Sequence, residues 1–122
     1  MVVADQVRQG CFALAFVISL AVLFAPAATV PTAPPGTDVV VHLAVFAALA
    51  YTSVLAGLPL LLAAVALPAY GGVSELIQAV PALGRSASLL DWVSDLVGVG
   101  LGLGVALAVR RTDRWWAPQR LR

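Results

Sequence analysis

Charge is scarce in this chain, and lysine is absent. Only 11% of the 122 residues are charged, and all seven basic residues are arginines. Soluble domains carry about a quarter charged residues, whereas here 61% of the residues are hydrophobic and the mean hydropathy is +1.00. This composition excludes an ordinary soluble domain. The length accommodates three to five spans of about 20 residues each, so the sequence predicts a small polytopic membrane protein.

Cysteine and histidine are also rare, with Cys11 and His42 the single examples of each. One cysteine and one histidine exclude a zinc-finger type of cluster, and Cys11 has no partner for an intrachain disulfide. No cofactor is predicted. A divalent cation held by the histidine and several carboxylates stays an open alternative, because such donors suit hard or borderline ions.

Apolar segments dominate what is present. Their approximate ranges are 11–30, 39–57, 59–80 and 89–109, and each is long enough to cross a bilayer. Prolines and glycines in 31–38 break the chain, and Gly57 and Pro59 divide the long apolar stretch that follows. We therefore predict an all-α membrane protein, a compact bundle of four transmembrane helices that forms a single domain over residues 1–122.

Helix-start signals accompany these segments. Thr37 or Asp38 is expected to cap the second helix, because a side-chain oxygen there can accept free backbone N–H groups. Ser88 and Asp91 form a Ser-x-x-acid pattern, which predicts a capping box at the start of the fourth helix.

The first segment has an alternative interpretation as a cleavable leader. It follows Arg8, and the small residues 25–27 after Phe24 resemble a cleavage site. The apolar character continues past residue 27, which favours a retained span.

Arginine placement predicts the orientation. Five of the seven arginines follow the fourth segment, and the positive-inside rule puts such a tail in the cytoplasm. Four spans then place the N-terminus there too. Trp115 and Trp116 are expected at the inner interface, and the tail is expected to contact anionic membrane lipids. A nucleic-acid partner is not expected.

This topology gathers six polar residues at the outer end of the bundle. They form three pairs, each on one helix: Asp38 and His42, Glu75 and Gln78, and Asp91 and Asp95. Spacings of three or four residues put each pair on one helix face. Gly98 and Gly102 extend the last face, where they permit close helix approach inside the bundle or an oligomer contact.

The predicted patch is rich in negative charge. Four carboxylates lie near one histidine and near Arg85, which belongs to the loop between the third and fourth apolar segments. A protonated His42, a carboxyl group protonated through like-charge crowding, or a bound cation would each restore balance. The sequence does not choose among these three.

The pattern resembles the VanZ-like family of bacterial membrane proteins over about residues 36–106. The likeness is carried by Asp38, His42 and Phe46 at spacings of four, Ser74-Glu75-Leu76-Ile77-Gln78, Gly84-Arg85-Ser86-Ala87-Ser88, Asp91, Asp95 and Gly98. The resemblance implies a multi-pass protein of the bacterial cytoplasmic membrane with a role in the cell envelope, because founding members are linked to teicoplanin resistance. It implies no settled reaction, and relatives often have asparagine in place of Asp95.

Our first hypothesis is a protein that modifies or binds an amphiphilic or lipid-linked substrate at the outer leaflet. His42 is the candidate general acid or base, since its unperturbed pKa lies near neutrality, and Glu75 or Asp95 would orient it. The candidate substrate-binding residues are Asp38, Gln78, Arg85 and Asp91. Arg85 would hold a phosphate or carboxylate group.

Two other classes of function remain open. Intramembrane acids and histidines are typical of proton or cation paths, but here they gather in one half of the bundle. The protein could also be a structural subunit whose polar face packs against a membrane partner. The sequence leaves open whether the protein is an enzyme, what its substrate is, and its oligomeric state.

Overall fold

The computed structural model describes the backbone of residues 2–25, 34–81 and 88–116, and the side chains of 5–25, 34–81 and 88–111. Four helices make up this part of the chain: α1 (Val2–Phe24), α2 (Thr37–Leu55), α3 (Leu60–Gln78) and α4 (Leu89–Trp116). The described residues contain no strand. Each helix is long and apolar enough to cross a membrane. The prediction of an all-α, four-span membrane protein is confirmed.

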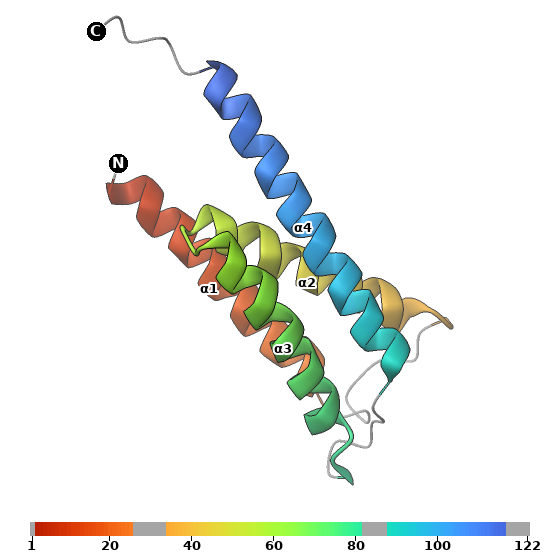
Figure 1. Ribbon diagram of the computed structural model, residues 1–122. Helices are drawn as coiled ribbons and strands as arrows, with labels where there is room; N and C mark the ends of the chain where they lie inside the picture. Colours follow the sequence, from red (N-terminus) through yellow and green to blue (C-terminus); the bar gives the residue numbers. More distant parts are fainter. Residues whose placement is uncertain (1, 26–33, 82–87, 117–122) are drawn as a thin grey trace, which may run out of the picture.

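The four helices run alternately in opposite directions (Figure 1). The start of α1 and the end of α4 therefore lie at one end of the bundle, together with the connection between α2 and α3. The end of α3 and the starts of α2 and α4 lie at the other end. The most extensive contact in the bundle joins α2 and α4.

The first helix differs from its predicted range of 11–30. It begins at Val2 and ends at Phe24, because charged Asp5 and Arg8 are compatible with a helix although they are not apolar. Pro26 follows in the sequence, and the residue before a proline is pushed away from helical geometry. Residues 26–30 of the predicted span lie outside the described residues.

The break between α2 and α3 is confirmed at the predicted glycine and proline. Gly57 adopts a left-handed φ of 95°, and its N–H donates to the carbonyl of Val54 at 3.1 Å. The N–H of Leu58 donates to the carbonyl of Ser53 at 3.0 Å. This pair of bonds is a Schellman motif, which satisfies carbonyls that the helix end would leave free. Pro59 then precedes α3.

The predicted side-chain cap of α2 is wrong. The cap position is Gly36, with a left-handed φ of 88° and no side-chain capping bond. Thr37 instead uses its hydroxyl to donate to the carbonyl of Pro34 at 2.7 Å. A glycine with positive φ fixes the chain direction here without a capping oxygen.

α4 extends beyond its predicted end at residue 109, and its backbone is helical as far as Trp116. Arg110 donates from Nη2 to the carbonyl of Val54 at 3.0 Å. A cation at this position stabilises the C-terminal end of α2, where the helix dipole is negative. The side chains of Trp115 and Trp116 lie outside the described set.

Close packing of α2 against α4 depends on two glycines. A Cβ on Gly98 would lie 2.5 Å from the carbonyl oxygen of Leu43, and a Cβ on Gly102 would overlap the carbonyl oxygen of Ala47. The prediction that this face points into the bundle is confirmed. Within the described residues α2 of the same chain packs against Gly98 and Gly102, and an oligomer contact through this face stays a prediction.

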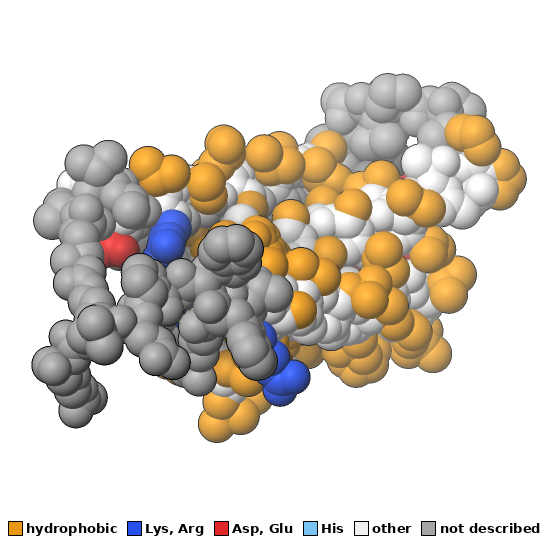
Figure 2. Space-filling model, turned by 90° about the horizontal axis from the view of Figure 1, so that it is seen from above, with side chains coloured by type: hydrophobic (Ala, Val, Ile, Leu, Met, Phe, Trp, Pro, Cys, Tyr) orange, Lys and Arg blue, Asp and Glu red, His pale blue; other side chains and the backbone are white. Residues whose placement is uncertain are grey.

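Large apolar side chains cover the outside of the bundle (Figure 2). The buried apolar core is small and centres on Phe46, Leu49 and Ala50 of α2. Leu23 of α1, Leu67 of α3 and Val99 of α4 pack with them. An apolar exterior around a thin core is expected where lipid replaces water as the solvent of the helices.

Candidate functional site

His42 lies at the centre of a buried polar cluster, at the end of the bundle opposite the start of α1 and the end of α4. Its Nδ1–H donates to Oδ1 of Asp95 on α4 at 2.7 Å. Both residues are buried, and Asp95 has no exposed surface. The contact joins α2 to α4 one to two turns inside the helix starts. A His–Asp pair of this kind fixes the ring orientation and the position of its proton.

Glu75 of α3 is the second carboxyl group of the cluster, and its two oxygens have different surroundings. Oε2 accepts a 2.8 Å hydrogen bond from the backbone N–H of Ser88. Oε1 lies 3.8 Å from Nδ1 of His42 and is buried, with no hydrogen-bond partner among the described residues. Glu75 therefore ties the start of α4 to α3 and presents a free oxygen to the histidine.

Asp91 contacts the opposite side of the imidazole. Its Oδ2 lies 3.8 Å from Nε2 of His42, and its side chain is 17% exposed. The three acids Glu75, Asp91 and Asp95 thus surround one histidine from two helices. Every ion pair that the structure defines among its described residues involves His42.

The predicted capping box of α4 is only half formed. Ser88 Oγ accepts a hydrogen bond from the backbone N–H of Asp91 at 3.2 Å, as expected. In a complete capping box the N–H of Ser88 would donate to Asp91, but here it donates to Oε2 of Glu75. This exchange leaves the Asp91 carboxyl group free to face His42.

Gly71 makes room for the buried acid. A Cβ at this position would lie 2.9 Å from Oδ2 of Asp95, a buried oxygen that accepts no hydrogen bond from the part of the chain that the structure describes. Aromatic side chains pack together on the side of the cluster nearer the α2–α3 connection. The ring of Tyr70 lies 5.8 Å from that of Phe46 and 5.6 Å from that of Phe16.

The cluster contains four of the seven predicted site residues: His42, Glu75, Asp91 and Asp95. Gln78 is also buried, but its Nε2 donates to the carbonyl of Leu23 at 2.7 Å and links α3 to α1. Asp38 is exposed in the first turn of α2 and does not pair with His42. Arg85 lies outside the described residues.

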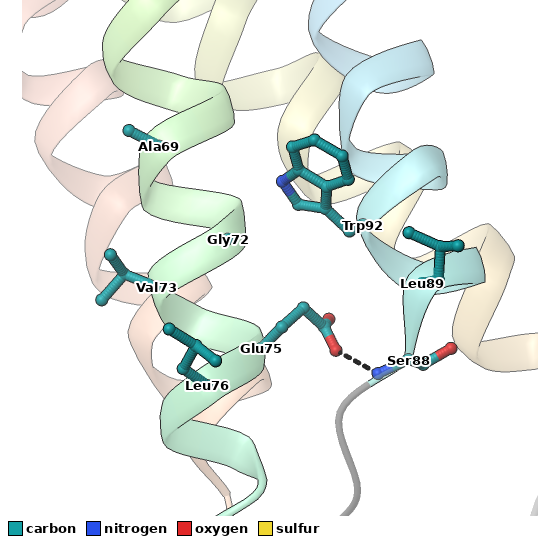
Figure 3. A pocket seen from close by; sticks show the side chains of 8 residues that line it. All are labelled: Ala69, Gly72, Val73, Glu75, Leu76, Ser88, Leu89 and Trp92. Carbon is teal, nitrogen blue, oxygen red and sulfur yellow. Dashed lines mark hydrogen bonds between the residues drawn. The ribbon is translucent and has the colours of Figure 1, made fainter.

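An apolar groove between α3 and α4 leads to the cluster (Figure 3). Its volume is about 570 Å³, and it opens at the side of the bundle. The lining residues are Ala69, Gly72, Val73, Glu75, Leu76, Ser88, Leu89 and Trp92. Glu75 is the acidic residue of this lining, and its carboxyl group points from α3 toward Ser88 at the start of α4 (Figure 3).

Trp92 is held at the upper part of the groove. Its indole Nε1–H donates to the carbonyl of Pro68 at 3.2 Å, so the ring lies between α4 and α3 (Figure 3). Sequence reasoning did not identify Trp92, Ser88 or Gly71 as parts of the site. Trp92 follows Asp91 directly, and Gly71 precedes Glu75 by four residues. Their spacing from these acids is the sequence feature that could have placed them at the site.

Two kinds of chemistry suit this arrangement. The His42–Asp95 pair can take up or release a proton, since imidazole is the side chain that titrates near neutral pH. Alternatively, His42, Glu75 and Asp95 each offer one ligand atom within 4.8 Å of the others, a spacing compatible with a shared metal ion. Comparison with known proteins adds nothing to this choice, because no protein-family model, curated protein or solved structure matches the chain.

Proposed function

We propose that the chain is a VanZ-like protein of the bacterial cytoplasmic membrane that binds an amphiphilic or lipid-linked molecule at the outer leaflet. On this proposal the protein acts on the cell envelope and lowers susceptibility to teicoplanin. The family assignment rests on the spacing of residues such as His42, Glu75 and Asp95 in the sequence.

The observation that carries this proposal is the position of Glu75, which lines the apolar groove and belongs to the histidine cluster. Ligand sites are typically apolar clefts with a few polar groups at defined positions. A groove of about 570 Å³ suits part of an acyl chain. The head group of the same molecule would then meet the cluster at the end of the groove.

Charge favours particular head groups. Three carboxyl groups surround His42, so a head group with amine or hydroxyl donors is preferred over an anionic one. Arg85, which we expected to hold a phosphate or carboxylate, carries no structural support because it lies outside the described residues. The proposed recognition of the head group therefore depends on the three acids and His42 alone.

The arginine-rich end of the chain supports the orientation. Arg110 and Arg111 lie near the end of α4, at the opposite end of the bundle from His42 (Figure 1). If this end faces the cytoplasm, as the positive-inside rule requires, the cluster faces the outer leaflet.

A proton or cation path is less well supported by the packing. Between the cluster and the α2–α3 connection, the buried residues of α2 include Phe46, Leu49 and Ala50. The hydroxyl of Ser53 donates to the carbonyl of Ala50 in its own helix at 2.8 Å. Among the described residues the polar contacts beyond the cluster are separate hydrogen bonds, such as the 3.0 Å bond between the hydroxyls of Ser19 and Tyr70, whereas a path would need a connected series.

Teicoplanin susceptibility of a bacterial host that produces the protein tests this proposal. The wild-type chain should raise the inhibitory concentration, and His42→Ala should abolish that effect. Ala69→Phe should also abolish it, because a large ring fills the groove without touching the charges. Asp38→Asn is the matched control, since Asp38, although expected from the sequence to bind the substrate, is an exposed acid outside the cluster and is left out of this proposal, and it should keep the effect.

Membrane levels of each variant must equal those of the wild type for this comparison to hold. A His42→Ala protein that inserts normally and protects as well as the wild type would contradict the proposal. Loss of protection in Asp38→Asn alone would also contradict it, because the groove and cluster would then not be the site.

A further inference from the structure

Three buried side chains from three different helices converge in the cluster with free ligand atoms. His42 comes from α2, Glu75 from α3 and Asp95 from α4, and their ligand atoms lie within 4.8 Å of one another. Nδ1 of His42 is 2.7 Å from Oδ1 of Asp95 and 3.8 Å from Oε1 of Glu75. Ligands at about 2.1 Å from one ion lie roughly 3–4 Å apart, so small side-chain shifts suffice.

Two carboxylate oxygens in this group have no hydrogen-bond partner in residues 5–25, 34–81 and 88–111. Oε1 of Glu75 and Oδ2 of Asp95 are both buried, and neither accepts a hydrogen bond from the described part of the chain. The side chain of Glu75 is 6% exposed and that of Asp95 is 0% exposed. An unsatisfied buried polar atom costs about 1–3 kcal/mol, and more when it is charged. Such atoms call for a ligand that supplies positive charge.

The surrounding charge points in the same direction. Glu75, Asp91 and Asp95 would leave a net negative charge on the cluster even with His42 protonated. The chain has no lysine. The described Arg110 is committed to the carbonyl of Val54, at the other end of α2. A divalent cation would neutralise both carboxylates that face the histidine nitrogen.

We propose that His42, Glu75 and Asp95 bind one divalent first-row transition-metal ion between them. The ligands would be Nδ1 of His42 and one carboxylate oxygen from each acid. An imidazole nitrogen among the donors favours ions such as Mn²⁺ or Zn²⁺ over Mg²⁺ and Ca²⁺, which prefer all-oxygen sites.

The metal ion takes the place of a proton. Nδ1–H now donates to Asp95, so coordination through Nδ1 displaces this proton: a doubly protonated ring releases it to the solvent, whereas a singly protonated ring transfers it to Nε2. In either case the neutral, metal-bound ring carries its one proton on Nε2, on the side of the Asp91 carboxylate at 3.8 Å. A carboxylate behind the free ring nitrogen is the usual arrangement for a metal-bound histidine. Asp91 is thus a positioning residue for the ligand.

This inference does not depend on the proposed amphiphile. The metal would bind to the cluster whether or not the groove is filled, and the ion can be measured with no substrate present. A groove-filling Ala69→Phe variant should therefore load metal normally while it loses protection against teicoplanin. Failure of one proposal is then distinguishable from failure of the other.

The experiment uses the full chain purified in nanodiscs of phosphatidylcholine, treated with a chelator and then titrated with Mn²⁺ or Zn²⁺. Bound metal is quantified by inductively coupled plasma mass spectrometry, and Mn²⁺ coordination is followed by electron paramagnetic resonance. The wild type should retain about one ion per chain. His42→Ala, Glu75→Gln and Asp95→Asn should each bind at least about tenfold more weakly.

Asp38→Asn is the control, because it removes a carboxylate at the same end of the bundle without touching the cluster. It should bind the ion as the wild type does. Circular dichroism and gel filtration establish that each variant remains helical and monodisperse. Retention of no ion by the wild type overturns the proposal, as does unchanged binding in a folded Glu75→Gln variant.

Discussion

At the scale of single residues, Glu75 has a structural and a chemical role that reside on different oxygens. Oε2 accepts a hydrogen bond from the N–H of Ser88 at the start of α4, whereas Oε1 faces His42 and has no hydrogen bond to the described residues. The first contact replaces half of a capping box and stabilises the fold. The second belongs to the cluster. The two roles can therefore be separated by substitution.

We expect Glu75→Ala to lower the free energy of unfolding by about 1–3 kcal/mol, because the N–H of Ser88 then loses its partner. Glu75→Gln should cost less than about 1 kcal/mol, since an amide oxygen can still accept that bond. Unfolding in mixed micelles with increasing dodecyl sulfate measures both values. Equal destabilisation by the two substitutions would contradict the assigned role of Oε2.

Residue types and helix faces of the site could be predicted from the sequence, but the partners could not. Spacings of three and four residues placed His42, Glu75, Asp91 and Asp95 on inward faces. The same reasoning placed Gln78 beside Glu75, yet Gln78 bonds to Leu23 of α1. Three residues advance a helix by about 300°, and the remaining angle of about 60° is enough to face a different neighbour. Helix crossings decide such partners, and no local pattern encodes them.

At the scale of helices, the contact between α2 and α4 holds the cluster together, since His42 and Asp95 lie on these two elements. Gly98 and Gly102 permit it, because side chains at both positions would meet the backbone of α2. Membrane helices lack a hydrophobic driving force between them and depend on such close packing. The geometry of the His42–Asp95 bond thus follows from glycines one and two turns away.

Gly98→Ala should separate α4 from α2, because its Cβ would lie 2.5 Å from the carbonyl oxygen of Leu43. Overpacking of this kind costs about 1–3 kcal/mol, and the backbone carbonyl cannot rotate away. Gly104→Ala is the matched control on the same helix, where a Cβ meets no described atom within 4 Å. It should be neutral or stabilising by up to about 1 kcal/mol. The same micelle unfolding assay distinguishes the two.

Helix positions were predicted well where proline or glycine marks a boundary. Gly57 and Pro59 bracket the α2–α3 connection as expected. Charge was a poorer guide to where a helix begins or ends: α1 includes Asp5 and Arg8, and α4 continues through Arg110. Hydropathy reports where a helix meets lipid, whereas backbone hydrogen bonds continue until a residue breaks them. The predicted ranges therefore describe the spans better than the helices.

At the scale of the whole molecule, four alternating helices put the start of α1 and the end of α4 at one end and the starts of α2 and α4, where the cluster lies, at the other (Figure 1). The bundle alone does not distinguish the two sides of a membrane. The arginines after the fourth span predict the side, because positively charged segments tend to be retained in the cytoplasm. An outward-facing cluster is thus a prediction from the charge at the opposite end of the chain.

Cysteine labelling in intact cells tests this orientation. In a Cys11→Ser background, Asp38→Cys should react with a membrane-impermeant maleimide, because position 38 is exposed at the cluster end. Pro59→Cys, in the exposed connection at the other end, should react only after the cells are permeabilised. Replacing the five C-terminal arginines by alanine should reduce this asymmetry, since it removes the positive charge that retains the tail. Labelling of Pro59→Cys but not Asp38→Cys in intact cells would place the cluster on the cytoplasmic side, where it could not meet an outer-leaflet amphiphile.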